Sequence, residues 1–525
     1  MKIDVQPAEP RSTTGFKPGG EMKSTTQEPQ SEKKKALVKE RDATMLSVVS
    51  EFADKTSLNG ILMIKTSNSF GARLFWVVVF LAAVGALTFH SYSIVVDYLS
   101  YQTTTSVQRT LDHNIQMPVI TICLENPIRK SKLNETSSVI IEYVQREQAK
   151  YGNPSSERVI LTSPEHTLLI KIVVEYKALE NIPNTTTDIF YYGLEHLRSE
   201  IRAKVGHQLE DILVNCGGTS ACGQSNFTVF QNIYYGNCYT LDTTWFEIND
   251  GNQGGILLQF FLEIDEYIEE IRESIGFKII LHDPNSMPNP EFEGFQILPG
   301  TQSNIALRLL QTQYLPQPYG DCVDHSNSEY FENYDYVYTE TFCIALCYAR
   351  NALEKCHCKT TFYDNVDLPE EFETADYCGD NDELYQCWKK EDNSEPPCDE
   401  CQSDCSLNTY NYKISSSIWP NSKALKGYLD QVCGKMSADR CARLRNQSES
   451  ELRENFVSAN IFYESFYVDS FTTDPAVTLT DFLCNFGGCI GLWIGLSIIS
   501  VFEVVQLVTE LFVAFCRICL LSRQE

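Results

Sequence analysis

Two long apolar runs dominate the pattern of hydrophobic and polar positions along the chain. The first has no charged side chain over the 23 residues between Arg73 and Asp97, which is long enough for a helix to cross a bilayer. The second is uncharged over the 21 residues between Asp481 and Glu503 and remains apolar beyond Glu503. A long hydrophilic segment precedes the first run, which argues against a secretory signal peptide. The pattern therefore predicts two membrane spans.

The charges around the two runs predict their orientation. Residues 1–73 carry 12 basic and 9 acidic side chains, and Arg517 and Arg523 follow the second run. The formal net charge of the chain is −28, so the acidic excess lies between the two runs. Because basic residues favour the cytoplasmic side of a membrane, we expect both termini in the cytoplasm of a plasma-membrane protein. The region between the runs then faces outside the cell.

Between the two runs the pattern is mixed and predicts an α+β domain. Residues 117–123 form an apolar segment typical of a strand, and residues 227–283 contain further strand-like runs. Residues 190–213 have a helical pattern, and residues 460–471 alternate as one strand that leads into the second span. The fold class that these patterns predict is a membrane protein with two transmembrane helices and a large α+β outer domain.

The chain thus divides into five predicted parts. In order, they are a cytoplasmic N-terminal region (1–72), a first span (73–98), an extracellular domain (99–478), a second span (479–515) and a cytoplasmic tail (516–525).

Cysteine usage agrees with this topology. Sixteen of the 20 cysteines lie between Cys123 and Cys441, an even number on the oxidising side of the membrane, where disulfides are expected. Ten of them fall within residues 322–405, which predicts a helix pair joined by disulfides. Cys398-X2-Cys401 and Cys356-His357-Cys358 have spacings that would also suit zinc, but thiols oxidise in this compartment. We therefore expect disulfides there, with no metal and no cofactor.

The four Asn-X-Ser/Thr sequons also fall in the predicted outer region. They are candidate glycosylation sites at Asn134, Asn184, Asn226 and Asn446.

Motifs of catalysis are absent from the sequence. It has no HExxH, no Gly-X-Ser-X-Gly and no phosphate-binding glycine loop, and its eight histidines are scattered. We expect neither an enzyme nor a nucleic-acid partner.

The second apolar run contains residues that disfavour an ordinary membrane helix. Gly487, Gly491 and Gly495 recur every four residues and would form one stripe on a helix. Such a stripe is compatible with close helix packing, or with a pore in which unwound backbone exposes carbonyl groups to ions. Glu503 favours the pore, because a carboxylate at membrane depth costs roughly 2.5–3.5 kcal/mol and usually faces water or a partner. With two spans per chain, a pore would have to form between several chains.

Several motifs, taken in order, resemble the degenerin, epithelial sodium channel and acid-sensing ion channel superfamily. MPVITIC follows the first run, YYGNCYTLD resembles a motif of the palm domain, and LPQPYGDC resembles the entry to the thumb. NIFYESFYVDSF is similar to the last palm strand, and Gly495-Leu496-Ser497 stands where the family has a Gly-X-Ser filter. Within the family, the chain most resembles the invertebrate peptide-gated channels of the FMRFamide type.

The resemblance implies a trimer with a hand-like outer domain of palm, finger and thumb around an amiloride-sensitive, sodium-selective pore. Gly495, Leu496 and Ser497 would form the selectivity filter, with Glu503 just below it. The homotrimer, or a heterotrimer with related subunits, would have the membrane, sodium ions, amiloride as a blocker and an amidated neuropeptide agonist as its partners. Seven disulfides carried over from the family, and one between the two cysteines left over, are Cys123–Cys238, Cys216–Cys222, Cys322–Cys405, Cys343–Cys401, Cys347–Cys398, Cys356–Cys387, Cys358–Cys378 and Cys433–Cys441.

The sequence departs from the family pattern at two places. The cytoplasmic His-Gly gating motif appears as Asn59-Gly60. At the outer mouth and gate, near Gly487 and Gly488, Cys484 stands at a position usually occupied by a small residue, and Asn485 replaces a common aspartate. Asp481 is four residues earlier and on the same helical face, so we expect it to supply the charge at the outer mouth.

The family contains channels opened by different stimuli. The segment VVDYLSYQTTT after the first span lacks the histidines of acid-sensing members, and residues 130–210 lack an Arg-X-Lys-Arg cleavage site of the epithelial type. Pro-Tyr-Gly at 318–320 is similar to peptide-gated members. These features favour a peptide-gated channel over a proton-gated, mechanically gated or constitutive one.

Two other classes share parts of this plan. ATP-gated purinergic channels also have two spans and a cysteine-rich outer domain, but the acidic outer region does not suit anionic ATP. A non-conducting two-span receptor would account for the disulfides and sequons, but not for Glu503.

Overall fold

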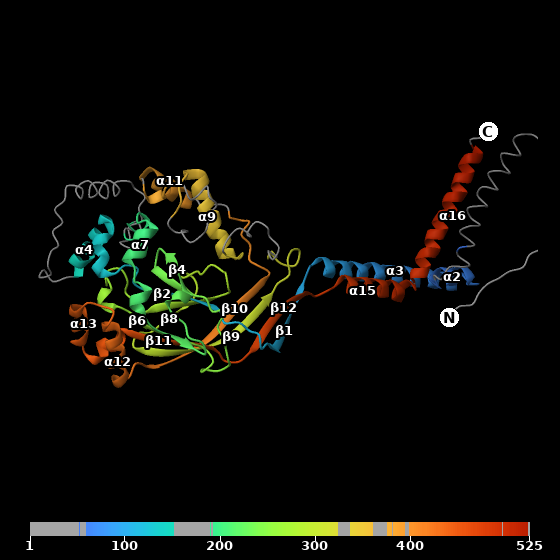
Figure 1. Cartoon of the computed structure of the whole chain (residues 1–525). Coiled ribbons are helices and arrows are strands. Elements are labelled where there is room, and N and C mark those ends of the chain that lie inside the picture. The colour runs from blue at the N-terminus through green and yellow to red at the C-terminus, as the bar shows by residue number, and fades with distance from the viewer. Residues whose placement is uncertain are drawn as a thin grey trace, which may run out of the picture. The chain divides into compact units, whose positions relative to one another are not determined.

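The protein folds into two units, each described here by itself (Figure 1). One contains residues 1–100 and 477–525, and the other contains residues 101–476. The structure, a computed structural model, describes residues 52, 59–151, 190, 193–323, 336–360, 375–380, 382–393, 398–495 and 497–522.

The larger unit is built on a seven-stranded sheet. Its strand order is β1-β12-β9-β11-β6-β3, and β10 also pairs with β9. β9 pairs antiparallel with β10 but parallel with β11 and β12. The bounds are β1 Thr103–Leu111, β3 Leu213–Gly218, β6 Ile256–Phe261, β9 Thr301–Gln313, β10 Ser406–Ile418, β11 Phe456–Tyr463 and β12 Tyr467–Pro475.

A five-stranded antiparallel sheet, in the order β4-β5-β2-β7-β8, completes the core. All six residues of β2 are buried, as the apolar segment 117–123 predicts. Side chains of both sheets, such as Ile122 and Ile461, belong to one hydrophobic cluster. The bounds are β2 Val119–Leu124, β4 Phe227–Asn232, β5 Gly236–Leu241, β7 Phe277–His282 and β8 Phe295–Ile297.

The predicted single strand over residues 460–471 is wrong, because the chain forms two strands there. All eight residues of β11 are buried, because alternate side chains such as Ile461 pack in the core between the two sheets, while Phe456 packs against α12. β12 begins at Tyr467 and pairs with the outer strand β1, where Arg109 forms an ion pair with Asp469. A strand that is covered on both faces need not alternate in sequence.

Short helices accompany the two sheets of the larger unit. The helical pattern predicted over 190–213 forms only two short helices among the described residues, α7 and α8, and β3 begins at Leu213. The predicted helix pair of residues 322–405 is present as α9 and α11. The bounds are η1 Lys130–Glu135, α4 Ser138–Tyr151, α7 Ser199–Val205, α8 Leu209–Ile212, η2 Gln224–Asn226, η3 Ile264–Glu266, α9 Glu340–Cys356, η6 Cys378–Asp380, α11 Asp382–Asn393, α12 Ser422–Cys433, α13 Ala438–Arg445 and α14 Glu449–Glu454.

Disulfides join these elements at many points. The pairs in the structure are the same eight that the sequence analysis expects: Cys123–Cys238, Cys216–Cys222, Cys322–Cys405, Cys343–Cys401, Cys347–Cys398, Cys356–Cys387, Cys358–Cys378 and Cys433–Cys441. Two of them, from Cys356 and Cys358, link the end of α9 to α11 and η6, where Trp388 and Tyr385 fill a small separate core.

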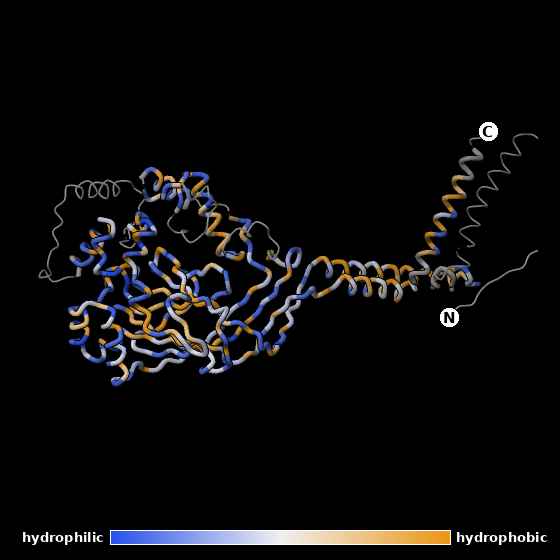
Figure 2. Tube along the Cα trace, in the orientation of Figure 1, coloured by the Kyte–Doolittle hydropathy of each residue, from blue (hydrophilic) through white to orange (hydrophobic). Residues whose placement is uncertain are grey.

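The smaller unit consists of α2 (Asn59–Thr66), α3 (Phe70–Leu99), α15 (Leu479–Ile494) and α16 (Ile498–Ser522). Ser69 caps α3, accepting a hydrogen bond from the backbone N–H of Ala72. Figure 2 shows hydrophobic residues concentrated along α3 and α15. Within the described ranges, α3 is the one helix whose length and composition suit a membrane crossing, by those criteria alone. The second predicted span is divided into two helices rather than one.

The close packing of β6 against β11 gives a test of the fold. A Cβ added to Gly255 would lie 2.1 Å from the carbonyl oxygen of Ile461 in β11. Because backbone must move to relieve this contact, Gly255→Ala should lower the free energy of unfolding by about 1–3 kcal/mol. Denaturation of the purified chain in detergent measures the change. Gly217→Ala in β3 is the control, since a Cβ there meets no atom within 4 Å. Equal stabilities of the two variants would contradict the packing.

Candidate functional site

The break in the second apolar run is the feature of the smaller unit that calls for a functional explanation. Gly495 ends α15 with φ 67° and ψ 24°, a left-handed conformation that glycine adopts without steric cost. Its N–H donates to the carbonyl oxygen of Gly491 at 3.1 Å. The predicted filter residue Leu496 lies outside the described residues. The chain resumes at Ser497, and α16 begins at Ile498.

Two serines stabilise the start of α16. The backbone N–H of Ser500 donates to Oγ of Ser497 at 3.3 Å, and the N–H of Ser497 donates to Oγ of Ser500 at 3.1 Å. This reciprocal arrangement satisfies N–H groups that a helix start otherwise leaves without partners. Glycine at the end of one helix and serine at the start of the next therefore make the break a property of the local sequence.

Glu503 is half-buried on α16 and three residues beyond Ser500. Ser497, Ser500 and Glu503 recur at intervals of three, which places them on one side of the chain as α16 begins. Farther along, Gln506 donates a hydrogen bond to Glu510 at 2.8 Å. Polar groups thus continue along α16 past the helix break, in a segment that is otherwise apolar.

The residues expected at the outer mouth lie in the first half of α15. Asp481 and Thr478 form a capping box, in which the N–H of Asp481 donates to Thr478 Oγ1 at 3.1 Å and Asp481 Oδ2 accepts from Thr478. Asp481 therefore has a structural role at the helix start, where its charge also suits the helix dipole. Cys484 and Asn485 are exposed, whereas Cys489 is buried.

Gly487 and Gly488 of α15 are not required by packing against the described residues. A Cβ added to Gly487 or Gly488 would meet no atom within 4 Å. Glycine in a helix interior costs about 1 kcal/mol relative to alanine. Within the described residues, no neighbour explains why this part of α15 carries glycine.

α3 lies alongside α15 in the same unit. Tyr98 and Phe482 are in ring contact with centroids 4.6 Å apart, and the indole N–H of Trp493 donates to Nδ1 of His90 at 3.2 Å. The sequence analysis overlooked His90. Its signal was present, because a histidine inside an uncharged run of 23 residues is unusual at membrane depth.

The remaining predicted sites are dispersed. Asn59 and Gly60 are the first two residues of α2. Of the four sequon asparagines, Asn134 and Asn446 are exposed, while Asn226 is half-buried and accepts a hydrogen bond from the N–H of Gly223 at 3.0 Å. Asn184 lies outside the described residues. No group of three His, Cys, Asp or Glu side chains in the described part of the chain is arranged to hold a metal ion.

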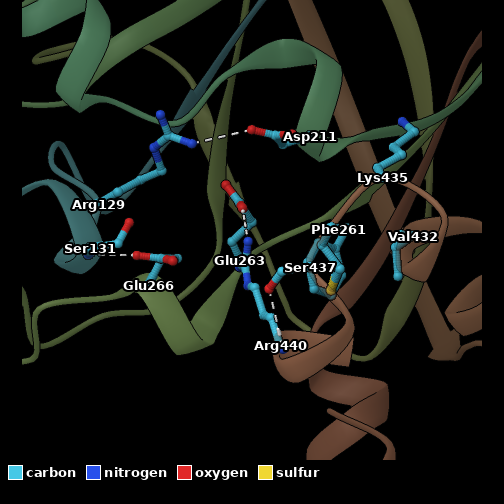
Figure 3. Close-up of a pocket in the computed structure, with 11 residues that line it drawn as sticks. Arg129, Ser131, Asp211, Phe261, Glu263, Glu266, Val432, Lys435, Ser437 and Arg440 are labelled. Atoms are coloured by element: carbon cyan, nitrogen blue, oxygen red, sulfur yellow. Dashed lines mark hydrogen bonds and ion pairs between the residues drawn. The ribbon is translucent and has the colours of Figure 1, made fainter. Parts of the chain in front are cut away.

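The larger unit contains a polar cavity of about 220 Å³ that sequence analysis did not predict (Figure 3). Glu263 lies beside it, fully buried, with a left-handed backbone at φ 52°. Its carboxylate accepts hydrogen bonds from His207 at 2.7 Å and from Arg440 at 2.8 Å. Arg440 also binds both carboxylate oxygens of Asp265, at 2.7 and 2.8 Å. The residues that line the cavity are Arg129, Ser131, Asp211, Phe261, Glu263, Glu266, Val432, Lys435, Met436, Ser437 and Arg440.

This cluster is a structural clamp. Burial opposes the ionisation of Glu263, but the hydrogen bonds and charges of His207 and Arg440 outweigh it and lower the pKa of Glu263 to about 2. Arg440 comes from α13, whereas Glu263 and Asp265 follow β6, so the ion pairs tie the helix to the sheet. No sequence pattern predicts this cluster, because its members come from three segments that are far apart in the sequence.

Removal of Arg440 should destabilise the larger unit. Arg440→Gln removes the arginine from the buried carboxylate of Glu263 and leaves it with His207 only; breaking a buried ion pair in this way typically costs about 3–5 kcal/mol. Because the folded pKa of Glu263 lies below its ordinary value of 4.5, its stabilising effect is complete above pH 4.5 and is lost as the pH falls toward 2. The variant should therefore lose part of its acid-dependent stability change, measured by thermal melting between pH 7 and 3. Arg445→Gln, which removes only an exposed ion pair with Asp430, is the control. A variant as stable as the control would contradict the clamp.

Comparisons with known proteins identify the family of this chain. The family model of the amiloride-sensitive sodium channel matches residues 52–507. The chain is 23% identical to the "FMRFamide-activated amiloride-sensitive sodium channel" of Cornu aspersum, over 89% of this chain and 83% of the relative.

Two human relatives are similar to comparable extents. Acid-sensing ion channel 2 is 25% identical over 89% of this chain and 86% of its own length. Epithelial sodium channel subunit alpha is 23% identical over 88% of this chain and 77% of its own length. The matched region includes both sheets, the eight disulfides and the break after α15. The chain therefore belongs to the amiloride-sensitive sodium channel family, whose members are ion channels and not enzymes.

Proposed function

We propose that the chain is a subunit of a trimeric, sodium-selective channel in the plasma membrane, blocked by amiloride, whose ion path passes Gly495, Leu496 and Ser497. The observation that carries this proposal is the helix break between α15 and α16. Backbone that is not helical is tolerated at membrane depth only inside protein or along a water-filled path. The second span would consist of α15, the break and α16, with α3 as the first span and both termini in the cytoplasm.

The glycine face of α15 supports an assembly of several chains. One α3, one α15 and one α16 cannot enclose a path, so neighbouring copies must supply the rest of its wall. A Cβ at Gly487 or Gly488 would meet no atom of the described residues within 4 Å, and small residues allow helices from other subunits to approach closely. The family resemblance implies three subunits, either identical or related.

Cation preference follows from the chemistry of the break. The last turn of a helix has carbonyl groups without intrahelical partners, and its dipole places partial negative charge there. At the end of α15 these groups would face cations that have shed part of their water. Glu503 would add a full negative charge deeper along the same path.

We further propose that an amidated neuropeptide opens the channel. The relative from Cornu aspersum is named as FMRFamide-activated, which supports this stimulus. In this chain Tyr319 of Pro-Tyr-Gly meets Tyr101, just beyond the end of α3, with perpendicular rings and centroids 5.4 Å apart. Tyr101 follows α3 in the chain, so this contact joins the Pro-Tyr-Gly turn to the segment that leaves the first span.

One experiment distinguishes the peptide from the other possible stimuli. Currents from cells expressing this chain alone would be recorded during application of amidated peptides and of acid. Activation by acid would favour the behaviour named for acid-sensing ion channel 2, and current without any stimulus would favour a constitutive or mechanically gated channel. No current from chains present at the surface would favour a non-conducting receptor.

Ser497→Phe tests the filter. A phenyl ring beside the path should abolish sodium current or change selectivity strongly, because Ser497 and Gly495 leave room there. Whole-cell recording with surface biotinylation measures both current and assembly. Unchanged conductance and selectivity would remove residues 495–497 from the filter.

Glu503→Gln tests the charge below the break. Loss of the carboxylate should reduce single-channel sodium conductance, since a cation is attracted less strongly at that depth. Glu510→Gln is the control, because it makes the same substitution at an exposed position farther along α16. Normal single-channel properties with impaired assembly would show instead that Glu503 serves only in packing.

Cys484 tests the outer mouth. It is exposed in α15, whereas Cys489 is buried, so a bulky cationic thiol reagent applied from outside should modify Cys484 selectively. Modification with agonist present should prevent full closure and leave a persistent current, because a crowded mouth tolerates little added volume. Cys484→Ser should abolish the effect. Identical responses of the wild type and Cys484→Ser would refute this placement of α15.

A further inference from the structure

The hydrogen bond between Trp493 and His90 joins two helices inside the apolar segments. The indole nitrogen of Trp493 is 3.2 Å from Nδ1 of His90, and the two ring centroids are 6.0 Å apart at an interplanar angle of 65°. An indole N–H can only donate, so Nδ1 of His90 must accept and carries no proton in this arrangement. In a bilayer, where water cannot replace the partner, neither group can be left alone without cost.

The place of this bond along α15 is the second observation. Trp493 is the penultimate residue of α15, two positions before the left-handed Gly495. At the other end of the helix, Phe482 meets Tyr98 of α3. These two contacts define an antiparallel pair of helices, in which Tyr98 and Phe482 hold the start of α15 and His90 and Trp493 hold its end.

The contact nearest the break has the most direct influence on it. Trp493 lies two residues before Gly495, and its hydrogen bond to His90 ties the last turn of α15 to α3. The direction of that turn also sets the direction of the carbonyl groups at its end.

We propose that His90 is a positioning residue for the filter: by accepting the hydrogen bond of Trp493, it fixes the end of α15 and so the orientation of the break at Gly495. This inference rests on the proposed function, because it gives the break a role in sodium selectivity. His90 does not contact the ion. It acts through Trp493, from a different helix.

The test is the permeability ratio of sodium to potassium, from reversal potentials under bi-ionic conditions. His90→Phe keeps a ring but removes the acceptor, and Trp493→Phe keeps a ring but removes the donor. Each should lower the ratio by about 2- to 10-fold, the effect of one hydrogen bond. The double variant should lower it no further, because both changes remove the same bond. His90→Asn should restore the ratio, since its Oδ1 can accept near the position of Nδ1.

Controls separate this role from general packing. Phe89→Leu changes an exposed neighbour on α3 and should leave the ratio at its wild-type value. If His90→Phe does not reach the surface, Trp493→Phe tests the bond from the other helix. Wild-type ratios in both single variants, with Ser497→Phe still altering selectivity, would overturn the positioning role alone. A wild type without sodium preference would overturn the proposed function as well.

Discussion

A helix that breaks inside an apolar segment must find partners for its freed backbone groups, and this constraint organises the smaller unit. Gly495 provides the left-handed residue that ends α15, and Ser497 and Ser500 satisfy the start of α16. The carbonyl groups at the end of α15 have no such cap from side chains of the described residues. In a bilayer they require water, ions or another chain. The glycine face, Glu503 and the family to which the chain belongs all agree with an ion path at this point.

In the larger unit, the first strand and the last strand pair with each other. β1 follows α3 in the chain and β12 precedes α15, and these two strands pair with each other in antiparallel register. Arg109 and Asp469, opposite each other in that register, add an ion pair across the two strands. Eight disulfides and the clamp of Arg440 on Glu263 stabilise the more distant parts.

Much of this structure was predictable because its signals are local or compositional. Apolar length predicted α3, and cysteine count and compartment predicted disulfides. The glycine stripe suggested a pore, but the second run was expected as one span, and residues 495–497 were singled out by the family resemblance. The pairing of the cysteines came from family resemblance and not from spacing. The resemblance also located Cys484 and Asn485, which the structure places on the exposed part of α15.

What escaped prediction depends on contacts between distant segments. Residues 460–471 alternate well enough for one strand, but the chain turns between β11 and β12, and β11 is buried by packing on both of its faces. The roles of Glu263 and His90 depend on Arg440 and Trp493, which are remote in sequence. Asp481 was expected as a charge at the pore mouth, and the structure shows it in the capping box of α15. A single sequence contains the residue types of such contacts but not their pairing.

The central claim, that this chain contributes to a sodium-selective path, is tested most directly in a planar bilayer. Purified chain with its disulfides intact would be reconstituted between sodium on one side and potassium on the other, with candidate peptides added on the side of the larger unit. The account predicts amiloride-sensitive currents that reverse toward the sodium equilibrium potential. Folded, trimeric protein that passes no current under any stimulus, or current without preference for sodium, would contradict it.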